Sequence, residues 1–177
     1  MSELAESWDR HVEPLTAVVN AVTDWDADSP CDNWSAADVL DHLMQTQRDF
    51  VGRQGREIPL LPGSPAEQWN HHQAAMAALV RDGDFVTTSI QTPFGESTIG
   101  RVLMDFYGMD LIVHRWDLAT SQGVDHRLSD AELDEVDAAV DGYGDAAYGP
   151  GIFDNPVDVP ADASRQQQVL ARTGRRA

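Results

Sequence analysis

Lysine is absent from the 177-residue sequence, so all 12 basic residues are arginine. They stand against 30 acidic residues, which gives a formal net charge of -18 at pH 7. Neutralisation of phosphate supplies most of the affinity of proteins for nucleic acid and for anionic membranes. We therefore expect neither as a partner, and interpret the excess of acid as a well-solvated surface.

Cysteine is nearly absent as well, because Cys31 stands alone. A single cysteine excludes an internal disulfide and a thiolate-rich zinc site, so a metal ion would need nitrogen and oxygen ligands. Cys31 lies just before a predicted helix and could approach its positive end. The alternative, a small packing residue, is the interpretation that we favour.

Long apolar runs are also missing, and none approaches the roughly 20 residues that a membrane-spanning helix needs. The first residues, MSELAESWDR, contain neither a basic patch nor an apolar stretch, so we expect no signal peptide and a cytoplasmic location. The length suits one domain, residues 1–177, of which 155–177 form a tail with a short helix.

Apolar residues at helical spacing predict four substantial helices, over residues 3–22, 36–51, 65–81 and 99–121. Ser35 and Ser64 have the pattern of helix N-caps, Ser129 predicts the start of a further helix, and Pro14 is expected to interrupt the first one. Residues 85–98 are rich in β-branched residues and predict a short hairpin. The fold class is therefore all-α, a four-helix bundle with a β-ribbon between the third and fourth helices and a short C-terminal helix.

The strongest local motif is DLIVHRWD, residues 110–117. Asp110 and His114 lie one turn apart on one helix face, among apolar neighbours. A charged pair in such surroundings is costly unless something compensates it, as a metal ion would. The alternative is an ordinary Asp–His hydrogen bond on a helix surface, which this spacing alone favours. Asp117, one turn further on, is expected to form structural hydrogen bonds.

A second motif, DVLDHLM, places His42 in the middle of the second helix. Asp38 lies one turn before it and is expected to orient its second ring nitrogen. The alternative, which the sequence alone favours, is a histidine at the edge of the core that is hydrogen-bonded to Asp38 and binds no metal.

For the other histidines and the tryptophans, the sequence predicts only whether each is exposed or buried. We expect His11 and His126 at the surface, and at least one of His71 and His72 exposed, since adjacent residues point about 100° apart on a helix. Trp34 and Trp116 are expected to anchor the core.

Two motifs and the tail carry a resemblance to a known family. The segment NWSAADVLDHLM, preceded by PCD, resembles the opening motif of the DinB-like (YfiT-like) superfamily of metal-binding bundles that includes the N-terminal domain of mycothiol-dependent maleylpyruvate isomerase. The segment DLIVHRWDLATSQG resembles the second motif of that superfamily. The tail, VPADASRQQQVLARTGRR, resembles its actinobacterial branch. The resemblance covers most of the chain.

The resemblance implies a DinB-like bundle, up-down with a crossover, in which His42, Asp110 and His114 hold a divalent metal ion. Zinc is expected, and nickel or iron suit the same ligands. It also implies a low-molecular-weight thiol such as mycothiol as cosubstrate, a small-molecule partner, a homodimer, and S-transferase or isomerase activity.

The full isomerase has a further C-terminal domain, whereas this sequence ends at Ala177, so we do not expect the maleylpyruvate reaction itself. A metal-binding or small-molecule-binding module without catalysis, and a metal-free bundle, are the alternatives.

Overall fold

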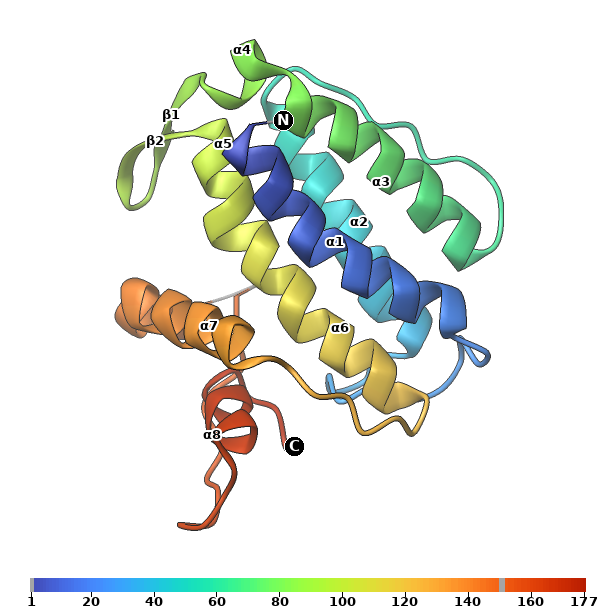
Figure 1. Ribbon diagram of the computed structural model, residues 1–177, viewed down its shortest axis with the longest axis vertical. Helices are drawn as coiled ribbons and strands as arrows, with labels where there is room; N and C mark the ends of the chain where they lie inside the picture. The colour runs from blue at the N-terminus through green and yellow to red at the C-terminus, as the bar shows by residue number, and fades with distance from the viewer. Residues whose placement is uncertain (1, 150–151) are drawn as a thin grey trace.

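The computed structural model describes residues 2–149 and 152–177. Helices dominate, and the only sheet in this described part is a two-stranded antiparallel hairpin, as Figure 1 shows. The elements are α1 (Glu3–Ala21), α2 (Ala36–Arg53), α3 (Pro65–Arg81), α4 (Gly83–Val86), β1 (Ser89–Thr92), β2 (Gly95–Thr98), α5 (Ile99–Val102), η1 (Leu103–Gly108), α6 (Met109–Ser121), α7 (Asp130–Tyr143), η2 (Gly144–Tyr148) and α8 (Arg165–Arg172). The predicted all-α fold with a short ribbon and a C-terminal helix is confirmed.

The helix starts follow the predicted capping residues. Ser35, Ser64 and Ser129 each accept a hydrogen bond from the backbone N–H three residues on, and the acidic side chain at that position bonds back to the serine N–H. These reciprocal bonds satisfy backbone donors that a helix start leaves unpaired. The local sequence therefore sets where the helices begin.

Pro14 does not interrupt the first helix, which is continuous from Glu3 to Ala21. A proline removes one backbone hydrogen bond and leaves the carbonyl one turn earlier without its donor. Both Pro14 and Arg10 are exposed, so water can reach that carbonyl. The buried face of α1 lies on the other side and is unaffected.

The four long helices pack so that α1 contacts α3 and α6, and α2 contacts the same two helices. Consecutive helices α1 and α2 therefore lie diagonally across the bundle, and residues 22–35 cross between them (Figure 1). The main core fills the space between these helices and includes Trp8, Leu15, Leu40, Trp69 and Met76, each at most 1% exposed. Within the described residues, no helix is long and apolar enough to cross a membrane.

The predicted fourth helix, 99–121, is one helical stretch with a wider π turn, η1, in its middle. Before that turn, Gly100 lets α5 pack closely on its neighbours. A Cβ there would lie 2.7 Å from Leu4 Cδ2 and 3.1 Å from the Val86 carbonyl oxygen. At the far end, Gly123 takes a positive φ of 72°, which fits the predicted helix stop.

Helix α6 separates two hydrophobic clusters. Its Leu111 and Leu118 belong to the bundle core, whereas Ile112, Val113 and Trp116 belong to a second cluster that α7 and α8 complete. Figure 1 shows α7 beside α6, outside the bundle, and α8 packed against α7. As a result α6 is buried on nearly all sides, and its polar side chains need partners inside the protein.

Candidate metal centre

Three side chains predicted from the sequence converge between α2 and α6. His42 Nε2 lies 3.7 Å from Asp110 Oδ2, and His114 Nε2 lies 3.3 Å from Asp110 Oδ1. The three donor atoms all lie within 4.8 Å of one another. Four ligands about 2.0 Å from a tetrahedral zinc ion are about 3.3 Å apart. The spacing of the two imidazoles and the carboxylate therefore fits the donor set of a divalent metal ion.

The electrostatics of the three residues favour a cation at this point. Burial alone would raise the pKa of Asp110, but the imidazoles of His114 and His42 outweigh it and hold that pKa well below its usual value. Burial likewise opposes a charge on His114. The negative charge of Asp110 outweighs this effect and raises the pKa of His114 well above its usual value, and hydrogen bonds to Asp110, Asp117 and Cys31 raise it further. A buried site that stabilises an imidazolium has a negative potential, which suits a metal ion.

Asp117 holds His114 from behind. The Nδ1 of His114 donates to Asp117 Oδ2 over 2.8 Å, and Asp117 itself is fully buried. Because Nδ1 is bonded to Asp117, Nε2, which faces Asp110, is the nitrogen that would coordinate a metal ion after giving up its proton. This is the common arrangement that fixes the ring orientation and the tautomer of a metal-binding histidine. The prediction that Asp117 forms structural hydrogen bonds is confirmed.

Two further residues complete the surroundings of Asp117. Arg175, from the C-terminal tail, donates through Nε and an NH2 group to the two carboxylate oxygens of Asp117, at 3.3 and 2.9 Å. The thiol of Cys31 donates to Asp117 Oδ2 over 3.3 Å and accepts from Arg175 over 3.3 Å. Burial opposes the charge of Asp117, but Arg175 and the bond from His114 hold its pKa below the usual value. Cys31, His114 and Asp117 thus form a second group of donor atoms that a metal could use.

The three converging residues line a cavity of about 520 Å³. Its remaining wall comes from the loop before α2 and from the tail: Cys31, Asp32, Asn33, Trp34, Ile152, Phe153, Asp154 and Arg175. A smaller cavity of about 160 Å³ shares His42 and Asp110 with it and extends toward Phe106 and Tyr107. A small molecule could therefore reach an ion held by these side chains.

Several sequence expectations need correction around the site. Asp38 does not orient His42, because its carboxylate is used by the N-cap Ser35, at 2.7 and 2.9 Å. Trp34 is half-buried and packs against the edge of the core, but it also lines the cavity, where its ring lies 4.9 Å from that of His42 and 6.2 Å from that of His114. Trp116, by contrast, is a core residue, as predicted.

The remaining histidines lie elsewhere. His11 was expected at the surface but is 6% exposed, because Glu135 of α7 covers it and bonds to its Nε2 over 2.7 Å. His126 is half-buried and accepts from Arg115 over 2.9 Å. Of the adjacent pair, His71 is exposed and His72 is buried, as the helical spacing predicts.

Sequence reasoning missed Phe153, Asp154 and Arg175 as neighbours of the site. Only Arg175 left a signal, since the Thr-Gly-Arg ending was part of the resemblance. No spacing rule connects it to Asp117, which lies 58 residues earlier.

Comparison with known families identifies one family over most of the chain. A family model described as the mycothiol maleylpyruvate isomerase N-terminal domain matches residues 4–119. The match includes His42, Asp110 and His114 but ends before α7. Neither a curated protein nor a solved structure matches the chain significantly. The chain belongs to the mycothiol maleylpyruvate isomerase N-terminal domain family.

Proposed function

From this membership, we propose that the protein binds a divalent metal ion through His42, Asp110 and His114 and uses it to activate a low-molecular-weight thiol. The observation that supports the proposal is the convergence of the three side chains on one cavity, with Asp117 holding His114 from behind. Two imidazoles and a carboxylate suit zinc, and nickel or iron are the alternatives for the same ligands.

The metal ion, when bound, would supply Lewis acidity that stabilises a thiolate at neutral pH. The protein side chains have separate tasks. Asp117 keeps His114 oriented, and Trp34 and Phe153 give the cavity an apolar wall that limits access of water. Tyr107, on the wall of the smaller cavity, stays a neutral phenol because burial raises its pKa to about 12. A mycothiol-type thiol would thus be the nucleophile in an S-transferase or isomerase reaction.

Metal analysis of protein purified without an affinity tag tests the ligand set. We expect about one equivalent of metal in the wild type and almost none in His42→Ala. Cys31→Ser is the matched control, because it removes a donor of the second group, Cys31, His114 and Asp117, and leaves the proposed ligands in place. Equal metal in wild type and His42→Ala, with loss in Cys31→Ser, would assign the ion to that second group instead.

Thiol turnover tests the catalytic part. The zinc-loaded protein should accelerate loss of free thiol when a low-molecular-weight thiol is mixed with an electrophile, and His42→Ala should not. If mycothiol and several other thiols show no acceleration, the catalytic proposal is wrong even if metal binds.

A binding module without catalysis is the second candidate. It is favoured by one observation: Cys31 and Arg175, which lie on the cavity wall, are both bonded to Asp117 and so are occupied. Reversible binding of a thiol to the metal-loaded protein, with no product formed, would support this module.

A further inference from the structure

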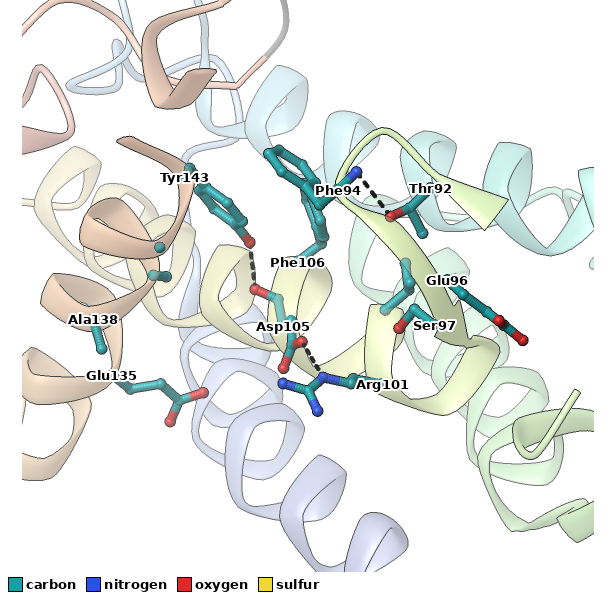
Figure 2. Close-up of a pocket in the computed structure, with 13 residues that line it drawn as sticks. Thr92, Phe94, Glu96, Ser97, Arg101, Asp105, Phe106, Glu135, Ala138 and Tyr143 are labelled. Atoms are coloured by element: carbon teal, nitrogen blue, oxygen red, sulfur yellow. Dashed lines mark hydrogen bonds and ion pairs between the residues drawn. The ribbon is translucent and has the colours of Figure 1, made fainter. Parts of the chain in front are cut away.

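A third cavity, of about 590 Å³, lies between the β1–β2 hairpin, η1 and α7 (Figure 2). Three aromatic rings from these three parts of the chain meet in its wall. The ring centroids of Phe106 and Tyr143 are 4.8 Å apart, and Phe94 lies 6.0 Å from Phe106 and 5.8 Å from Tyr143. Phe94 is 53% exposed, although burial of such a ring is favourable. The cavity therefore offers an open aromatic surface.

The charges around these rings are mostly negative. Glu96, Asp105 and Glu135 line the cavity, and Arg101 is the only basic residue on its wall. Figure 2 shows Arg101 turned to Asp105, and their side chains lie 3.1 Å apart. Among the described residues, Glu96 has no ion-pair partner. Aromatic faces attract organic cations, and the net charge of -18 adds to that attraction.

The aromatic cavity is a neighbour of the metal centre. Phe106 lines both the aromatic cavity and the small cavity that contains His42 and Asp110. Phe106 precedes Asp110 by four residues, about one helical turn, and belongs to the π turn η1. Such turns are rare and occur frequently at functional sites. A ligand seated on Phe106 would therefore lie beside the metal cavity.

We propose that this aromatic cavity binds the second substrate, an organic cation with an aromatic or apolar body. The assignment as a substrate site rests on the proposed function of the metal centre. The aromatic wall takes up the apolar body, while Glu96 attracts the cationic group and repels anions. Asp105 and Glu135 are already bonded to Arg101 and His11, so Glu96 is the carboxylate that remains for a ligand. An anionic oxo-acid such as maleylpyruvate is therefore a poor ligand for this cavity.

A matched pair of probes tests the charge preference. The full-length protein is titrated with 2-naphthylmethylamine, a cation at neutral pH, and with 2-naphthoate, which has the same ring system and the opposite charge. We expect the cation to bind at least about tenfold more tightly at low salt. Calorimetry gives both dissociation constants. Equal affinities, or tighter binding of the carboxylate, would overturn the proposal.

Substitutions locate the bound cation. Phe94→Ala and Glu96→Gln should each weaken binding of the amine by about threefold or more. Both residues are exposed, so the fold should persist, and unchanged thermal unfolding checks this. Leu60→Ala is the control, because Leu60 is 60% exposed and lies outside the cavity wall. Equal losses in all three variants, or none, would contradict the assignment.

Paramagnetic relaxation tests the placement next to the metal. In the cobalt(II)-loaded protein the proton signals of the bound naphthyl ring should broaden, whereas the zinc-loaded protein is the diamagnetic control. Amine binding without broadening would overturn the role as a substrate site and leave the metal centre intact. Failure of the wild type to bind cobalt or zinc would overturn the proposed function and this role with it.

Discussion

Asp117→Asn should separate metal binding from folding at the centre of this site. The substitution keeps the shape of the side chain but removes the charge that faces Arg175, which is 7% exposed. Leaving one charge of a buried pair without its partner costs about 3–5 kcal/mol of stability. It also gives His114 Nδ1 a neutral partner that can act as donor, so the ring loses its fixed tautomer. Loss of such a partner typically lowers metal affinity by about 10- to 100-fold.

The two effects need two assays. Urea unfolding of the metal-free protein gives the loss of stability, and competition with a chelator of known affinity gives the loss of zinc binding in variants that remain folded. Asp125→Asn is the matched control, because Asp125 is paired with Arg127 over 3.0 Å but both side chains are more than 70% exposed. We expect that control to change neither quantity, since exposed pairs contribute little. Wild-type zinc affinity in folded Asp117→Asn would refute the reasoning about His114.

Other regions give further expected outcomes. Burial lowers the pKa of His72 to about 3, so the unfolded chain takes up a proton below pH 6.5 while the folded protein does not. The protein should therefore lose about 2 kcal/mol between pH 7.5 and pH 5 that His72→Gln does not lose, as urea unfolding at the two pH values would show; equal pH slopes would contradict this. Gly100→Ala should cost about 1–3 kcal/mol, because its Cβ would meet Leu4 and Val86, and wild-type thermal unfolding would refute the close packing. Zinc at 100 times its dissociation constant should add about 2.7 kcal/mol to the free energy of unfolding, and chelation should reverse the gain; no shift would count against a metal site in the folded state.

The elements that were predicted well depend on local chemistry. The pattern of a serine followed three residues later by an acidic residue predicts a helix start at Ser35, Ser64 and Ser129. The structure has a capping box at each of these three serines. The hairpin is likewise set by Pro93 and Gly95 between β-branched residues. Such features need no knowledge of the rest of the chain.

The site was only partly predictable because its supports are distant in sequence. The spacing of Asp110 and His114 placed them on one face, but it could not place Arg175 behind Asp117 or Glu135 over His11. The π turn in η1 was also missed, since helical periodicity alone does not mark where one turn widens. The homodimer and the absence of nucleic-acid partners stay predictions.

Helix α6 also bears on how the chain is organised. Because it contributes to both hydrophobic clusters, we propose that residues 1–177 behave as one domain rather than as a bundle with an independent tail. A single unfolding transition, seen alike by far-ultraviolet circular dichroism and by tryptophan fluorescence, would support this. Two separate transitions would contradict it.

The proposed ligands and part of the cavity wall come from different segments of the chain, and this affects how relatives can diverge. The proposed ligands belong to residues 4–119, the part that the family model matches, whereas Ile152, Phe153, Asp154 and Arg175 come from beyond it. Mutations in this later segment can change the cavity wall while the proposed metal ligands stay in place. Arg175 is the exception, since its contact with Asp117 ties the exchangeable part to the inherited one. If relatives evolve toward a new substrate, we expect changes at Ile152, Phe153 and Asp154 but not at Arg175.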